Sequence, residues 1–151
     1  MIGRVVGEVR AGELVVQCAV LSDRYACASA AQALATRLGL RREAAMQVAI
    51  AAAELASNAV RHGGGGALTL ARVDTPRAAL ELTCRDAGSG IADVGAALRD
   101  GHSRGRDLAP DDGRREGLGA GLGAVARAMD ELTIETGPAG TVIIARKWLR
   151  P

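Results

Sequence analysis

Residues 44–66 read AAMQVAIAAAELASNAVRHGGGG, and this stretch decides the fold. Alanine has the highest helix propensity of all residues, so the run predicts a long helix from about Arg41 to His62. Four consecutive glycines, 63–66, should end this helix abruptly because glycine is costly inside one. Glu54 and Asn58 are four residues apart, so both side chains should project from the same helix face.

The segments on either side of this helix predict an α+β fold. Ser22 is a candidate N-cap for a preceding helix that Gly39 stops. Neighbouring strands are mostly joined by short turns; the expected strands are 5–9, 14–20, 67–73, 78–85, 131–136 and 141–149. A third helix is expected over 118–129, and a short one within 91–100. We expect a two-layer α/β sandwich with about three helices on one face of a mixed, mostly antiparallel sheet. A doubly wound α/β fold is the weaker alternative because strict β-α-β alternation is absent.

Composition excludes several classes of nucleic-acid-binding protein. Aromatic residues make up 1% of the 151 residues, with one Trp, one Tyr and no Phe. Proteins that bind single strands need aromatic side chains on which bases stack. The net charge of +2 arises from 19 basic and 17 acidic residues, which is too balanced for binding that depends on many phosphate contacts. We therefore expect no direct nucleic-acid partner.

The single lysine excludes two common ATP-binding designs. Every basic residue other than Lys147 and the two histidines is an arginine. A P-loop ends in Lys-Ser or Lys-Thr, whereas Lys147 precedes a tryptophan. A eukaryotic-type protein kinase needs a strand lysine upstream of its catalytic loop, and Lys147 lies too near the C-terminus for that role.

The cysteines and the apolar runs indicate a cytoplasmic protein. The chain has three cysteines, an odd number, and no two of them have C-x-x-C spacing; they are Cys18, Cys27 and Cys84. The sequence therefore predicts neither a disulfide framework nor a zinc site. Free, buried thiols in a reducing compartment are expected. The N-terminal residues MIGRVVGEVR do not form a signal peptide. The most apolar run, 44–59, is too short and too polar to span a membrane, so no membrane partner is expected.

Two of the polar motifs could contact a ligand. Glu54 and Asn58 project from an alanine-rich helix face, whose small side chains leave room for a ligand. A solvated polar stripe on an amphipathic helix would give the same sequence pattern. The stretch DAGSG, 86–90, follows a predicted strand. Asp86 can only accept hydrogen bonds, which suits an exocyclic amine such as that of adenine, and Gly88 and Gly90 allow a tight turn. Alone, this stretch fits a simple turn equally well.

Two further motifs follow. The stretch GLGAGLG, 117–123, opens a predicted helix, and exposed amides at a helix N-terminus suit phosphate. A Rossmann fingerprint is excluded because a polar segment, and no strand, precedes it. That segment, 101–117, holds four arginines and almost no apolar residue, so we expect a mobile surface loop. The pair Gly140-Thr141 opens the last strand.

Taken in order, ELxxN, DxGxG, GxGxG and a final GT resemble the GHKL (Bergerat-fold) ATPase superfamily. The resemblance covers about residues 13–150 and implies one GHKL ATPase/kinase domain over 1–151, with 101–117 as an ATP lid. Its size looks like the anti-sigma-factor serine/threonine kinase family. The segments GLGAGLGAVARAMDEL and RKWLR look most like the RsbT-type stressosome switch kinases within that family.

The resemblance implies a role for each motif. Asn58 would ligate Mg²⁺ and Glu54 would be the general base. Asp86 would bind the adenine amine, Gly88 and Gly90 would shape the pocket, and Thr141 would reach adenine through water. The lid glycines would wrap the phosphates; they are Gly117, Gly119 and Gly121. One arginine of the lid would contact the γ-phosphate. The candidates are Arg104, Arg106, Arg114 and Arg115, and we include Arg115 in the predicted site.

The implied function is ATP-dependent, Mg²⁺-dependent phosphorylation of a STAS-domain antagonist or scaffold protein in a partner-switching pathway. A PP2C-type phosphatase or a sigma factor is a further possible partner. The alternative is an anti-sigma factor or nucleotide-gated binding module that acts mainly by sequestering its partner. A globular domain with coincidental glycine motifs is the remaining alternative.

Overall fold

A computed structural model describes residues 5–7, 12–99, 102–103, 106–107 and 121–150. Six strands form one sheet in the order β1-β2-β3-β4-β8-β7. Their bounds are β1 Val5–Gly7, β2 Glu13–Cys18, β3 Gly66–Val73, β4 Ala79–Asp86, β7 Glu131–Gly137 and β8 Gly140–Trp148. Every strand pair of this sheet in the described part of the chain is antiparallel, so the expectation of a mixed sheet is refined to a fully antiparallel one.

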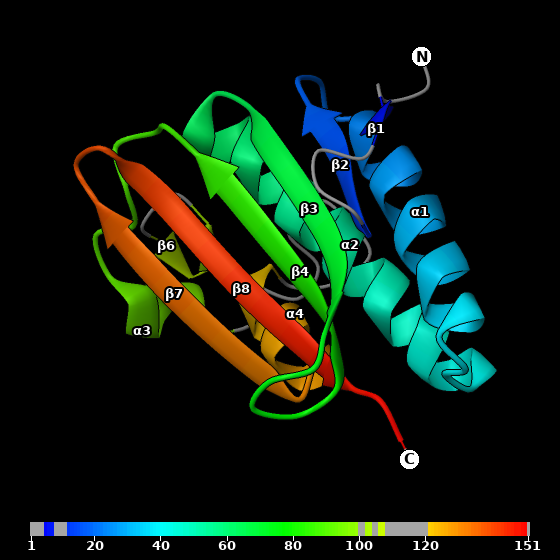
Figure 1. The fold of residues 1–151 in the computed structure, drawn as a ribbon. Coiled ribbons are helices and arrows are strands. Elements are labelled where there is room, and N and C mark those ends of the chain that lie inside the picture. Colours follow the sequence, from blue (N-terminus) through cyan, green and yellow to red (C-terminus); the bar gives the residue numbers. More distant parts are fainter. Residues whose placement is uncertain (1–4, 8–11, 100–101, 104–105, 108–120, 151) are drawn as a thin grey trace.

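Helices cover one face of the sheet (Figure 1). They are α1 Asp23–Arg37, α2 Arg42–Gly63 and α4 Leu122–Ala128, and a four-residue helix, α3 Val94–Ala97, follows β4. A separate two-stranded pair consists of β5 His102–Ser103 and β6 Arg106–Asp107. The predicted α+β two-layer sandwich is confirmed. No helix in the described ranges is long and apolar enough to cross a membrane.

The core lies between α2 and the sheet. Alanines on α2 are fully buried and let the helix lie close to the strands, where they meet leucines from two neighbouring strands. The facing leucines are Leu68 and Leu70 of β3 and Leu80 and Leu82 of β4. Because alternate strand residues point to one face, these leucines all lie on the side of the sheet that faces the helix. Helix α1 packs along α2 on the far side from β4 (Figure 1).

The start of α1 follows the sequence prediction only in part. Ser22 precedes the helix, but its side chain makes no capping hydrogen bond, and its own backbone is already helical (φ −67°, ψ −14°). The Asp23 carboxylate instead accepts hydrogen bonds from the backbone N–H groups of Ala19 (2.8 Å) and Val20 (3.0 Å). Ser22 thus occupies the predicted N-cap position, with Asp23 in the first turn, but the buried Asp23 carboxylate and not the Ser22 hydroxyl makes the hydrogen bonds there.

The three cysteines are free and buried, as predicted. The Sγ atoms of Cys18 and Cys27 lie 3.6 Å apart, within hydrogen-bonding distance of each other. That contact lowers the pKa of Cys18 and raises the pKa of Cys27. Burial raises the pKa of Cys84 to about 12, so this thiol is neutral at physiological pH. Its Sγ donates to the carbonyl oxygen of Leu55 on α2.

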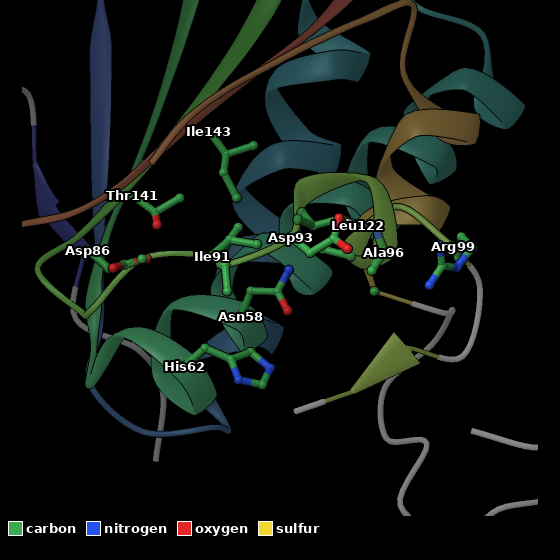
Figure 2. Close-up of a pocket in the computed structure, with 14 residues that line it drawn as sticks. Asn58, His62, Asp86, Ile91, Asp93, Ala96, Arg99, Leu122, Thr141 and Ile143 are labelled. Atoms are coloured by element: carbon green, nitrogen blue, oxygen red, sulfur yellow. Dashed lines mark hydrogen bonds between the residues drawn. The ribbon is translucent and has the colours of Figure 1, made fainter. Parts of the chain in front are cut away.

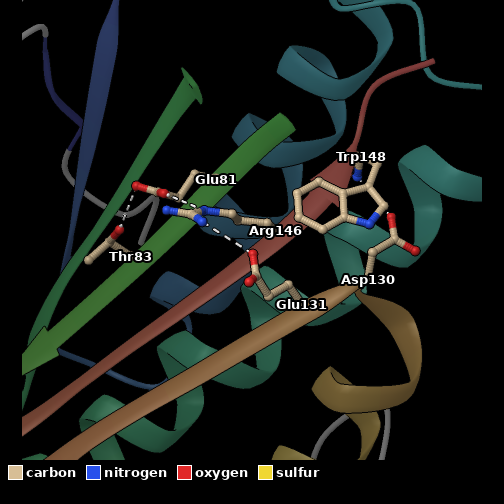
Figure 3. A network of polar contacts seen from close by, with 6 residues as sticks. All are labelled: Glu81, Thr83, Asp130, Glu131, Arg146 and Trp148. Atoms are coloured by element: carbon tan, nitrogen blue, oxygen red, sulfur yellow. Dashed lines mark hydrogen bonds and ion pairs between the residues drawn. The ribbon is translucent and has the colours of Figure 1, made fainter. Parts of the chain in front are cut away.

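The outer face of the sheet carries a charged network across β4, β8 and β7 (Figure 3). Glu81, Arg146 and Glu131 occupy one row of the ladder. Arg146 Nε lies 2.8 Å from Glu81 Oε2, and Arg146 Nη1 lies 3.2 Å from Glu131 Oε2. The contact with Glu81 raises the pKa of Arg146. This row sets the register of three strands on the side away from the helices.

On the inner face, Lys147 connects β8 to two helices. Its Nζ donates to Gln47 Oε1 on α2 and to the carbonyl oxygen of Ala128, the last residue of α4, both at 2.7 Å. A cation at a helix C-terminus is favoured by the helix dipole. The single lysine therefore holds α2 and α4 in place against the sheet.

We expect Lys147→Met to lower the free energy of unfolding by about 1–3 kcal/mol, because it leaves two partly buried oxygens without their donor. Urea denaturation followed by circular dichroism measures the change. Arg72→Met is the matched control, since Arg72 forms an exposed ion pair with Asp74 at 3.0 Å. Exposed pairs contribute about 0–1 kcal/mol. Equal effects of the two substitutions would contradict the role of Lys147.

Candidate functional site

A pocket of about 430 Å³ opens between the C-terminal half of α2 and the ends of β4 and β8. Its other walls come from α3, the loop before it and the start of α4. The lining residues are Asn58, His62, Asp86, Gly90, Ile91, Ala92, Asp93, Ala96, Ala97, Arg99, Gly121, Leu122, Thr141 and Ile143. A volume of this size suits a small-molecule ligand. Five of the residues predicted from sequence thus line one pocket: Asn58, Asp86, Gly90, Gly121 and Thr141.

Asp86 and Thr141 come together because β4 ends where β8 begins. They are direct partners in the antiparallel ladder. Asp86 is half-buried and its Oδ1 accepts a hydrogen bond from the Gly88 amide at 2.9 Å, which orients the carboxylate. Thr141 is only 4% exposed. A hydrogen-bond acceptor and a hydroxyl therefore lie side by side at this end of the pocket (Figure 2).

Gly88 and Gly90 are required by close backbone approach. A Cβ on Gly88 would lie 2.7 Å from Gly63 Cα and 2.9 Å from the His62 carbonyl oxygen, both on the last turn of α2. Gly90 has φ +91°, and a Cβ there would collide with the carbonyl oxygen of Gly137. Gly88 does not line the pocket itself but lets the loop pack against α2. Gly88 thus allows close packing on α2, and Gly90 allows close packing on the end of β7.

Helix α2 contributes Asn58 and His62, which are one turn apart, to the pocket. Asn58 is half-buried, with its side-chain amide directed into the pocket (Figure 2). Glu54, one further turn back, is 2% exposed and is not among the lining residues. The predicted Glu54 and Asn58 stripe therefore divides into a buried carboxylate and a pocket amide. The alternative of a solvated polar stripe, which the sequence alone did not exclude, does not describe these two residues.

The polar groups are distributed along the pocket. Asp86 and Thr141 lie at one end in Figure 2, Arg99 lies at the other, and Asn58 lies between them in this view. Arg99 is exposed and follows α3. A ligand with an amine-bearing ring at one end and negative charge toward the other matches this order of groups.

Among the described residues, no group of three or more His, Cys, Asp or Glu side chains could hold a metal ion. The Asn58 amide oxygen is a suitable ligand for Mg²⁺, which typically takes one or two protein oxygens and completes its shell with water and phosphates. The Asn58 amide therefore fits a magnesium ion that is brought by a phosphate ligand. The assignment of Asn58 to the metal stays a prediction.

Part of the predicted site lies outside the described residues. Gly117, Gly119 and Arg115 fall there, as does most of the predicted lid, 101–117. Gly121 is described: it precedes α4 with φ +69°, and its carbonyl oxygen accepts from the amides of Ala124 and Val125. That positive φ is favoured by glycine.

Sequence reasoning did not single out Asp93, Arg99 or Thr136. Asp93 lines the pocket and caps α3, with its Oδ1 accepting from the Ala96 amide at 3.0 Å. The sequence could have indicated the capping role of Asp93, since an Asp before a short apolar run is a common N-cap. Thr136 contacts two elements of the pocket wall, and a threonine in a predicted strand gives no such signal. Arg99 becomes a candidate only when its position at the pocket is known.

Comparisons with known proteins show which family the chain is similar to. Residues 21–147 match the family described as "Histidine kinase-like ATPase domain". The chain is 34% identical over 119 residues to "Serine/threonine-protein kinase RsbT" of Bacillus subtilis (strain 168), covering 78% of this chain and 82% of that protein. Among solved structures, it is similar to a histidine kinase domain from the Erythrobacter litoralis EL346 blue-light activated histidine kinase. That match has 19% identity and a TM-score of 0.48, and covers 83% of this chain and 60% of the other.

We expect Gly88→Ala to impair the pocket, because its Cβ would meet backbone atoms of α2 that cannot move aside like a flexible side chain. Calorimetric titration with ATP should detect at least about a tenfold loss of affinity, since a misplaced wall costs more than about 1.4 kcal/mol.

The matched control is Gly95→Ala in α3. A Cβ there would lie 3.4 Å from Asp93 Oδ1, an ordinary contact, and alanine favours the helix. Affinity should stay within about twofold of wild type, a change below about 0.5 kcal/mol. If both alanine variants bind ATP like wild type, the 86–90 loop does not need its close approach to α2.

Proposed function

Because the chain belongs to the family of histidine kinase-like ATPase domains, we propose that it is a serine/threonine protein kinase that binds ATP in the pocket beside α2. The observation that carries this proposal is the convergence of Asp86, Thr141 and Asn58 on one pocket. Its relative RsbT bears the name of a serine/threonine-protein kinase, which supports protein phosphorylation as the reaction.

The adenine ring would lie at the Asp86 end. The Asp86 carboxylate accepts the hydrogen of the exocyclic amine, and the neighbouring Thr141 hydroxyl reaches the ring directly or through water. Gly90 and Ile91 bound the ring on the loop side, and Ile143 adds an apolar contact from β8. Because Asp86 is fixed by the Gly88 amide, little ordering is needed when the base binds.

The phosphates would extend toward Asn58. When bound, Mg²⁺ neutralises phosphate charge, and Asn58 would supply its protein oxygen ligand. Gly121 forms part of this wall, with Gly117 and Gly119 proposed as its continuation in the lid. One lid arginine, Arg115 among the candidates, is proposed for the γ-phosphate, since a guanidinium pairs well with phosphate oxygens.

Glu54 is the proposed general base. Phosphoryl transfer needs positioning and charge neutralisation above all, together with a group that accepts the proton of the attacking hydroxyl. Glu54 lies one helical turn from Asn58, but it is 2% exposed and does not line the pocket, so its carboxylate would have to turn toward the pocket to meet the attacking hydroxyl. The serine or threonine oxygen would bond to the γ-phosphorus as its proton passes to Glu54, and ADP leaves.

The proposed substrate is a STAS-domain antagonist or scaffold protein in a partner-switching pathway. A PP2C-type phosphatase is a further proposed partner, with the cytoplasm as the location. The whole chain, 1–151, would then act as one kinase domain with 101–117 as its ATP lid. The alternative is an anti-sigma factor that acts mainly by sequestration, and stable co-purification with a sigma subunit would favour it.

We expect wild-type protein to bind ATP and ADP more tightly with Mg²⁺ than without it, and Asn58→Ala to lose this dependence. The amide is the proposed protein ligand of the ion, so affinity for Mg²⁺-ATP should fall about tenfold or more when it is removed. Isothermal titration calorimetry measures both quantities. Gln32→Ala, which removes an exposed amide from α1, should change neither. Undiminished Mg²⁺-dependent binding by Asn58→Ala would remove Asn58 from the metal site.

We expect Glu54→Gln to bind ATP like wild type but to transfer phosphate about 100-fold or more slowly, since a general base contributes about 10²–10⁴-fold. Transfer from labelled ATP to a purified STAS-domain antagonist protein measures the rate. Glu43→Gln, an exposed residue in the first turn of the same helix, is the control and should transfer normally. Normal transfer by Glu54→Gln would assign the base to another group.

A further inference from the structure

Thr136, on the edge strand β7, joins two parts of the pocket wall through one oxygen atom. Its Oγ1 accepts a hydrogen bond from the Ile91 amide at 2.7 Å and lies 2.9 Å from Thr141 Oγ1. Ile91 and Thr141 both line the pocket, whereas Thr136 does not. Thr136 and Thr141 are also direct partners in the β7–β8 ladder.

The neighbouring glycines bring the loop to this hydroxyl. Gly90 packs so tightly on Gly137 that a Cβ would meet the Gly137 carbonyl oxygen, and it would lie 3.1 Å from Thr136 Oγ1. The loop that carries Gly90 and Ile91 is therefore fixed to the end of β7 at two adjacent points. One point is the backbone contact between Gly90 and Gly137, and the other is the hydrogen bond to the Thr136 hydroxyl.

The hydrogen-bonding capacity of a hydroxyl limits how these groups are arranged. A threonine hydroxyl has one hydrogen to donate and two lone pairs. In the described part of the chain, Thr136 Oγ1 makes two hydrogen bonds, and the one from Ile91 uses a lone pair. Either hydroxyl can donate across the 2.9 Å contact between Thr136 Oγ1 and Thr141 Oγ1, and we take Thr136 as the donor. The hydrogen of Thr141, which lines the pocket, would then be free to meet a ligand there.

We infer that Thr136 is a positioning residue that makes the pocket select adenine over guanine. This inference rests on the proposed function, that is, on ATP binding with its base beside Asp86. With Thr136 donating, Thr141 presents a donor next to the Asp86 acceptor. Adenine offers the complementary pair, an exocyclic amine beside a ring nitrogen that accepts. Guanine would place its O6 acceptor against the Asp86 carboxylate and its N1–H donor against the Thr141 hydrogen, and the second of these mismatches is the one that depends on Thr136.

The test compares affinities for ATP and GTP. Calorimetry on wild type, Thr136→Val and Thr136→Ser gives the dissociation constants, and thermal unfolding reports on stability. We expect Thr136→Val to weaken ATP binding about tenfold and to lower the ATP-to-GTP preference, because Ile91 loses its acceptor and the Thr141 hydroxyl is free to rotate. Thr136→Ser keeps the hydroxyl and should retain the preference within about twofold.

Thr133→Val is the matched control, an exposed threonine on the same strand whose substitution should change neither affinity nor preference. Should Thr136→Val fail to fold, Thr136→Ala is measured instead and must show the same loss. An unchanged preference in the folded variant that lacks the hydroxyl would overturn the inference while leaving ATP binding intact. A preference lost equally in Thr136→Ser would also overturn it. A wild type that binds neither nucleotide would overturn the proposed function and this inference together.

Discussion

The site depends on the absence of side chains where α2 ends against β4. A Cβ on Gly63 would collide with the Asp86 side chain, and a Cβ on Gly66 would collide with the Arg85 carbonyl oxygen. Between them, Gly64 turns the chain with φ +71° from the helix into β3. The helix that carries Asn58 can therefore lie directly against the end of β4, which carries Asp86. Any larger residue at these positions would separate the two halves of the pocket.

The same closeness extends along α2 into the core. Alanine at Ala52, Ala56 and Ala59 lets the helix axis lie near the leucines of β3 and β4. Packing of small against large residues leaves little freedom for the helix to shift. Lys147 then fixes the far end of the layer by binding α2 and α4 at once. The position of the site is thus a property of the core and not only of the pocket residues.

Most of the fold followed from the sequence, because helix propensity, glycine positions and strand alternation all favoured the same layout. The differences have local causes. Ser22 occupies the N-cap position of α1 as predicted, but the hydrogen bonds at this end are made by a buried acid one residue later. Asp86, Asn58 and Thr141 were predicted from motif order, and the structure brings them to one pocket. Thr136 and Arg99 could not be predicted, since the relevance of Thr136 comes only from strand pairing and that of Arg99 only from its position at the pocket.

The pairing of Asp86 with Thr141 has a consequence for how the pocket moves. Both residues belong to the β4–β8 ladder, whose amides should exchange their hydrogens with solvent only when the whole domain opens. The opposite wall is built on a four-residue helix, α3, which is too short to be stable alone. One end of the pocket is therefore as rigid as the core, and the other opens locally at little cost. Bound ligand would leave first from the α3 side, while its contacts with the sheet persist longest.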